Sequence, residues 1–122
     1  MHLGSVYLIV RDFEKSIDFY EKFLSMKVST RNCGNKFAEF FFDEKCLALM
    51  NEDNIPGHHY EDGDHKFVLN FWVDDLQREY DRLKELDIGE MTEINKVHDG
   101  YYYFNVLDPD KNVCEITGGY TP

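Results

Sequence analysis

The feature that most constrains the fold of this chain is an internal repeat with a spacing of 63 residues. Shifting the sequence by this spacing places an apolar run, an aspartate and an amphipathic segment over a second copy of each. The matches share one register and pair Val10 with Val73, Asp12 with Asp75, Phe13 with Leu76, Ile17 with Tyr80, Asp18 with Asp81, Tyr20 with Leu83 and Phe23 with Leu86. The repeat predicts two copies of one supersecondary unit in a chain of 122 residues.

Each copy begins with a strand and a capped helix. Residues 3–10 are rich in β-branched and aliphatic side chains, which predicts a strand. Over 13–24 the apolar residues recur at steps of three and four behind Asp12, a helix-capping residue, which predicts an amphipathic helix. The second copy repeats the strand, the cap and the helix at 66–73, Asp75 and 76–86.

Three further strands are predicted after each helix. They fall at 26–30, 36–42 and 46–50 in the first copy and at 91–96, 100–107 and 113–118 in the second. The last two are joined by the turn sequence from Asp108 to Asn112. Two helices can cover only one face of so many strands. We therefore expect an α+β fold in which two βαβββ repeats form a cupped mixed sheet, with the helices on the outer face and a ligand-sized hollow on the other.

The chain length suits one domain with one core. We expect a single domain over 1–122, with repeat one at about 1–51, a connecting loop at about 52–64 and repeat two at about 65–122. The loop is polar and contains Pro56, Gly57 and Gly63.

Charge and cysteine content exclude several classes of partner. A formal net charge of −11 repels phosphate backbones and anionic membrane surfaces, so we expect neither nucleic acid nor a membrane as partner.

No run approaches the roughly 20 apolar residues that span a bilayer, and no apolar signal segment follows Met1. Cys33, Cys46 and Cys114 are odd in number and lack the short spacings of zinc or redox sites, which favours reduced thiols and a cytoplasmic location.

Two motifs add a resemblance to a known family. The pattern V-x-D-[FL]-x-x-S-x-x-F-Y-x-x-x-L runs from Val10 to Leu24, and D-P-D-K-N-x-x-E runs from Asp108 to Glu115. Together with the repeat, they resemble the glyoxalase, bleomycin resistance and extradiol dioxygenase superfamily, also called the vicinal oxygen chelate superfamily. The resemblance covers nearly the whole chain and implies a homodimer.

The same resemblance implies where a metal would bind. Metal-dependent members place one ligand on the first strand and one on a late strand of each half, and these positions correspond here to Ser5, Ala48, Val68 and Glu115. Only Glu115 keeps a carboxylate, whereas catalytic metal sites normally use about three side-chain ligands. We therefore expect no metal site and no cofactor.

Histidines offer an alternative ligand set. His2 and His65 are 63 residues apart, each three residues before an implied ligand position. Side chains an odd number of residues apart on a strand point to opposite faces. His2 and His65 therefore become ligands only if the strand register differs from the expected one. His58, His59 and His98 lie in predicted loops or turns, where a solvated side chain is the simpler interpretation.

The alternation of side chains along the strands instead predicts a ligand pocket. If Glu115 faces inward, its companions on the neighbouring strands share that face. Aromatic rings there would stack on a flat or cationic molecule, and polar groups would orient it. The predicted ligand-binding residues are Ser5, Tyr7, Ala48, Met50, Val68, Asn70, Trp72, Tyr103 and Glu115, and their alternative role is to form plain core.

Three functions follow from these observations. The leading hypothesis is a metal-free protein that binds a small, aromatic or cationic molecule in the cup. The second is a metal-dependent lyase or isomerase of glyoxalase type, in which Glu115 moves a proton and is the catalytic residue. The third is a dimeric interaction module whose cup is filled by its own side chains.

Overall fold

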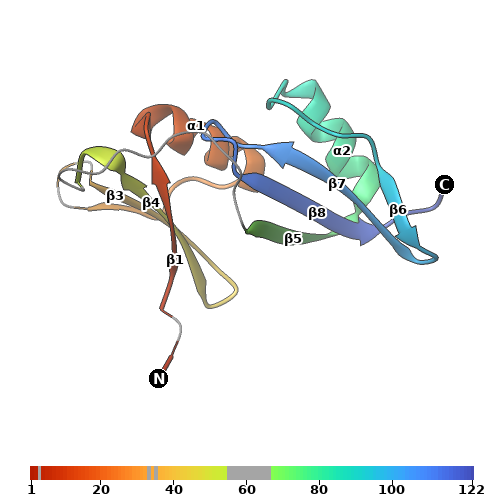
Figure 1. The fold of residues 1–122 in the computed structure, drawn as a ribbon, viewed down its shortest axis with the longest axis horizontal. Helices are drawn as coiled ribbons and strands as arrows, with labels where there is room; N and C mark the ends of the chain where they lie inside the picture. Colours follow the sequence, from red (N-terminus) through yellow and green to blue (C-terminus); the bar gives the residue numbers. More distant parts are fainter. Residues whose placement is uncertain (3, 33, 35, 55–66) are drawn as a thin grey trace. The chain divides into compact units, whose positions relative to one another are not determined.

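A computed structural model describes residues 1–122 apart from 3, 33, 35 and 55–66 (Figure 1). The chain divides into two compact units, Met1–Glu61 and Asp62–Pro122. Neither helix in the described ranges is long and apolar enough to cross a membrane.

The first unit has one helix and a four-stranded mixed sheet. Strand β1 lies parallel to β4, and β4, β3 and β2 pair antiparallel in the sheet order β1-β4-β3-β2 (Figure 1). In chain order the elements are β1 (Val6–Val10), α1 (Phe13–Leu24), β2 (Thr30–Asn32), β3 (Phe37–Phe42), β4 (Lys45–Asn51) and a 3-10 turn (Glu52–Asn54).

The second unit repeats this topology. Its sheet order is β5-β8-β7-β6, with β5 parallel to β8 and the other pairs antiparallel. The elements are β5 (Val68–Asp75), α2 (Leu76–Glu85), β6 (Asn95–His98), β7 (Tyr101–Leu107) and β8 (Val113–Gly119). The predicted fold class is confirmed: the protein is α+β and contains two βαβββ modules, each with its own sheet.

The aspartates at the repeat positions begin both helices. The Asp12 carboxylate accepts from the Lys15 backbone N–H at 3.1 Å, and Asp75 accepts from that of Arg78 at the same distance. Each bond satisfies a backbone donor that the first helical turn leaves unpaired. Helix α1 ends where Ser25 takes up a left-handed conformation, with φ of 56°.

Each helix packs on one face of its own sheet. Tyr20 of α1 contacts Phe40 of β3, with ring centroids 6.4 Å apart, and Tyr80 of α2 meets Phe104 of β7 edge-on at 5.2 Å. The strand residues on these faces are buried, namely Leu8, Val10, Ala38, Phe40, Leu47 and Leu49 in the first unit and Phe104, Val106, Cys114 and Ile116 in the second. The alternate residues lie on the opposite face, which we call the helix-free face of each sheet.

The motif from Asp108 to Asn112 forms a closed turn between β7 and β8. Asp108 Oδ1 accepts from the backbone N–H groups of Asp110 and Asn112, each at 2.8 Å, and Asp108 Oδ2 accepts from Asn112 Nδ2 at 2.8 Å. Asp108 is buried. Because the turn fixes where β8 starts, it also fixes which face Glu115 occupies.

Two predicted strands were placed wrongly. Residues 26–29 are not a strand, because the Val28 N–H bonds to the Glu21 carboxylate at 2.9 Å and keeps this segment beside α1. The strand predicted at 91–96 begins only at Asn95, although Met91 makes an isolated bridge to Val106.

The connecting loop is described only in part. The interval 52–64 opens with the 3-10 turn Glu52–Asn54. The rest of it, with His58 and His59, lies outside the described residues, as do His65 and Cys33.

Candidate functional site

The helix-free face of the second sheet brings polar side chains together in its centre. Across β5, β8 and β7, Asn70 pairs with Glu115, which in turn pairs with Asn105. The next row contains Trp72, Thr117 and Tyr103, and the row on the other side contains Val68, Val113 and Leu107. The face therefore combines a polar central row with one aromatic and one aliphatic border.

Glu115 is held by a side chain of the parallel neighbour strand. Asn70 Nδ2 donates to Glu115 Oε1 at 2.8 Å and lies 3.5 Å from Thr117 Oγ1. Within the described residues the second oxygen of Glu115 accepts no hydrogen bond. Glu115 is half-buried, so it presents a fixed carboxylate with one free acceptor.

Asn105 carries an acceptor that the fold leaves unused. Its backbone N–H donates to Thr92 Oγ1 at 2.9 Å, and its carbonyl accepts from the Thr92 N–H at 2.9 Å. Its side-chain Oδ1 is buried without a hydrogen-bond partner in the described part of the chain. Sequence reasoning missed this residue, although its place between the aromatic and aliphatic residues of β7 marks it as a polar interruption.

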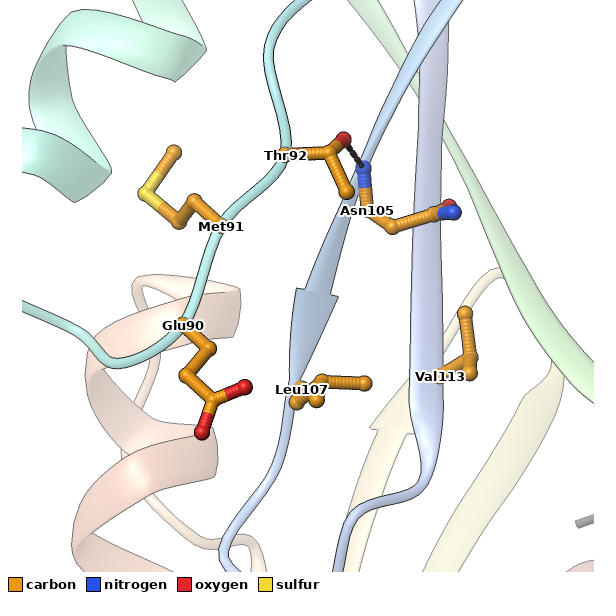
Figure 2. Close-up of a pocket in the computed structure, with 6 residues that line it drawn as sticks. All are labelled: Glu90, Met91, Thr92, Asn105, Leu107 and Val113. Atoms are coloured by element: carbon orange, nitrogen blue, oxygen red, sulfur yellow. Dashed lines mark hydrogen bonds between the residues drawn. The ribbon is translucent and has the colours of Figure 1, made fainter. Parts of the chain in front are cut away.

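A pocket of about 190 Å³ opens beside Asn105 (Figure 2). The backbone of the segment at its edge pairs with β7, since the Leu107 N–H donates to the Glu90 carbonyl at 3.0 Å. Lys111 Nζ lies 3.0 Å from Glu90 Oε1. The lining residues are Glu90, Met91, Thr92, Asn105, Leu107 and Val113, all of them in the second unit.

The helix-free face of the first sheet carries a carboxylate of its own. Tyr7, Ala48 and Glu39 are neighbours across β1, β4 and β3. Glu39 Oε1 accepts from Thr30 Oγ1 at 2.8 Å, and Glu39 Oε2 lies 3.6 Å from Cys46 Sγ. Sequence reasoning passed over Glu39, which strand alternation places on the same face as Tyr7.

Cys46 lies on this helix-free face and is half-buried. Burial raises the pKa of the Cys46 thiol, a hydrogen bond with Ser5 lowers it, and the Glu39 carboxylate raises it again. The net effect is a raised pKa, so the thiol stays protonated and can donate to Glu39. Cys114, by contrast, is fully buried in the second unit.

The predicted ligand-binding residues differ in their exposure. Trp72 is 74% exposed, Val68 53% and Tyr7 50%, whereas Ala48 is completely buried. Asn70 is exposed, and the rest are half-buried, namely Ser5, Met50, Tyr103 and Glu115. Tyr7 meets Phe37 edge-on, with ring centroids 5.9 Å apart.

The side chains present do not fit the divalent metal of metal-dependent superfamily members. Of the four implied ligand positions, only Glu115 supplies a strong ligand, since Ala48 and Val68 are aliphatic and Ser5 is a neutral hydroxyl. Among the residues that the structure describes, no three or more of His, Cys, Asp and Glu gather where they could hold a metal ion. His98 instead contacts the ring of Tyr101, with centroids 5.5 Å apart.

One curated relative is similar in sequence, and several solved structures share this fold. The uncharacterized protein YraH of Bacillus subtilis (strain 168) is 32% identical over 127 residues, covering 95% of this chain and 97% of its own. A lactoylglutathione lyase from Agrobacterium tumefaciens has a TM-score of 0.73 at 17% identity, covering 97% of this chain and 93% of its own.

Two further structures have the same fold. A glyoxalase-related enzyme from Fulvimarina pelagi has a TM-score of 0.79 at 19% identity and covers 97% of this chain and 88% of its own. The fosfomycin resistance protein FosX from Mesorhizobium loti has a TM-score of 0.69 at 18% identity and covers 98% and 92%. The model of the Glyoxalase/Bleomycin resistance protein/Dioxygenase superfamily matches residues 2–116, and the chain belongs to that superfamily.

Proposed function

We propose that this protein binds a small cationic molecule on the helix-free face of the second sheet, without a catalytic metal. The observation that carries the proposal is the carboxylate of Glu115, which Asn70 holds at 2.8 Å while its second oxygen accepts nothing from the described residues. A half-buried carboxylate with a free oxygen gains most from a partner that brings both charge and hydrogen-bond donors.

The aromatic border supports the same ligand class. Trp72 and Tyr103 lie one row from Glu115 on the same face, and an exposed indole or phenol ring attracts a cation through its π face. The net charge of −11 concentrates cations around the molecule and repels anions.

The side chains at the implied metal-ligand positions support binding without metal chemistry. Solved structures with this fold include both a lyase and a resistance protein, so the fold alone allows either outcome. In this chain one carboxylate stands where a catalytic site would need about three ligands. We therefore regard a metal-dependent lyase or isomerase as the second candidate function.

Metal content decides between these two functions. The purified protein would be analysed by inductively coupled plasma mass spectrometry and then titrated calorimetrically with nickel, zinc and manganese at neutral pH. We expect far less than one metal per chain and no heat of binding. A content near one per chain, or micromolar affinity, would overturn the proposal and favour the lyase or isomerase.

The role of Glu115 is tested by Glu115→Gln, in a screen of small cations followed by nuclear magnetic resonance titration. Glutamine keeps an oxygen that accepts from Asn70 but removes the charge, so affinity should fall about tenfold or more, the usual effect of losing a charged hydrogen bond. Glu85→Gln is the matched control, because Glu85 is exposed at the end of α2. Equal affinities in both variants would contradict a binding role for Glu115.

A further inference from the structure

The pocket of the second unit is shaped for a compact apolar group. Its volume is about 190 Å³, and a cavity of about 150 Å³ is enough to hold benzene. Leu107 and Val113 are direct cross-strand partners on β7 and β8, and their side chains form its apolar side (Figure 2). A ring or branched alkyl group of about this size would fill the space.

Asn105 places an unused acceptor beside that apolar side. It lies two residues before Leu107 on the same face of β7, and its Oδ1 is buried without a hydrogen-bond partner in the described chain. The terminal torsion of an asparagine side chain is soft, so the amide can turn its oxygen toward the pocket. A ligand donor there would satisfy an atom that the unliganded protein leaves unpaired.

Neighbouring groups add acceptors and negative charge. Glu115 is the cross-strand partner of Asn105, and its second oxygen accepts nothing from the described residues. Glu90 lines the same pocket, with one of its oxygens near Lys111. Among the described residues, the only side-chain donor bonded to Glu115 is Asn70, which bonds to one of its two oxygens. The surroundings therefore match a group that has several donors and a positive charge.

We propose that the ligand is a primary ammonium compound whose N–H groups bond to Asn105 Oδ1 and Glu115 and whose compact apolar group fills the pocket beside Leu107 and Val113. This inference rests on the proposed binding of a cation and adds the ligand class. An ammonium supplies three donors and a charge, an alcohol supplies one donor without charge, and a quaternary ammonium supplies charge without a donor.

Three probes with the same ring separate these contributions. Benzylamine, benzyl alcohol and benzyltrimethylammonium would be titrated at neutral pH into the full chain labelled with ¹⁵N. We expect benzylamine to bind at least about tenfold more tightly than either other probe, the usual effect of losing a charged hydrogen bond. Its chemical-shift changes should centre on the Asn105 side-chain amide, Leu107 and Val113.

Asn105→Val supplies a second, independent readout. The variant should lose the preference for benzylamine, and its ligand-free melting temperature should rise, because an unpaired buried oxygen is replaced by a side chain that suits a strand. Asn95→Val is the matched control on β6, since the Asn95 amide already donates to the Glu93 carbonyl at 2.9 Å. The control should keep the benzylamine affinity and show no such rise.

The possible failures are distinguishable. If benzyltrimethylammonium binds as tightly as benzylamine and only Glu115→Gln weakens both, the ammonium inference is wrong and cation binding stands. A lower melting temperature for Asn105→Val, with unchanged benzylamine affinity, would likewise overturn the inference and assign Asn105 a structural role. If no charged probe binds and Glu115→Gln changes nothing, the inference and the proposed function both fail.

Discussion

The carboxylates on the two helix-free faces differ in how they are hydrogen-bonded. Each face keeps one carboxylate near its centre, on β3 as Glu39 in the first unit and on β8 as Glu115 in the second. Glu39 is bonded through both oxygens, to the Thr30 hydroxyl and the Cys46 thiol, whereas Glu115 is bonded to Asn70 through one. Since a carboxylate with a free oxygen can take up a ligand at lower cost, the second unit offers the better binding position.

The thiol of Cys46 provides a test of the first face. Because burial and Glu39 raise the pKa of Cys46, its thiolate fraction at neutral pH is below that of an ordinary cysteine, and its alkylation should need a higher pH than that of an ordinary cysteine. Glu39→Gln removes a charge that raises the pKa, so the midpoint of the alkylation rate should move to lower pH. Iodoacetamide labelling followed by peptide mass spectrometry measures this midpoint.

Ser5→Ala is a control variant that should shift the alkylation midpoint in the opposite direction. The Ser5 hydrogen bond lowers the pKa of Cys46, so its loss should move the alkylation midpoint to higher pH. Midpoints that move the same way in both variants would contradict this account of the Cys46 environment.

The sequence predicted some of these residues and missed others for a physical reason. Glu115 follows a turn motif, and strand alternation from it places Asn70 and Trp72 on one face, as the structure shows. Glu39 and Asn105 lie inside aromatic and aliphatic strands whose composition indicates burial. The Glu39 carboxylate accepts from Thr30, 9 residues away, and the Asn105 backbone N–H donates to the Thr92 hydroxyl, 13 residues away. Which neighbour satisfies a polar side chain depends on strand register, which the sequence does not specify.

At the scale of elements, the turn before β8 is the strongest link between sequence and site. Asp108 is buried and accepts from two backbone N–H groups and the Asn112 amide. Asp108→Ala leaves these donors unpaired and should lower the free energy of unfolding by roughly 2–4 kcal/mol. Urea denaturation measures the change.

Asp108→Asn is the graded control for this turn. Its remaining oxygen can still accept from the backbone of Asp110 and Asn112, while the contact with Asn112 Nδ2 is lost. The loss in unfolding free energy should therefore be well below that of Asp108→Ala. Equal losses would show that the backbone bonds contribute little to the turn.

Element order was predictable because local signals specify it. The period of the apolar residues and the capping aspartates gave α1 from Phe13 to Leu24, as observed, and α2 to within one residue. The predicted strand boundaries were wrong where hydrogen-bond pairing sets them. The Glu21 carboxylate of α1 accepts from the Val28 N–H, and β2 starts only at Thr30. A side chain seven residues away in sequence overrides the local strand propensity there.

At the scale of the whole molecule, the excess of negative charge makes a prediction independent of any one contact. A net charge of −11 attracts a cationic ligand over distances comparable to the Debye length, which shrinks from about 30 Å at 0.01 M salt to about 3 Å at 1 M. Benzylamine affinity should therefore fall several-fold between low and high sodium chloride, while the affinity of benzyl alcohol should hardly change. Calorimetry at matched pH measures both.

Benzoate completes this test, because it has the same ring and the opposite charge. The carboxylates of Glu90 and Glu115 offer it no donor and repel its charge, and the surrounding field opposes its approach. We expect no binding at low salt, where the field is strongest. Benzoate binding that equals that of benzylamine would mean that the apolar side of the pocket alone selects the ligand, and that the carboxylates on this face serve the fold and not recognition.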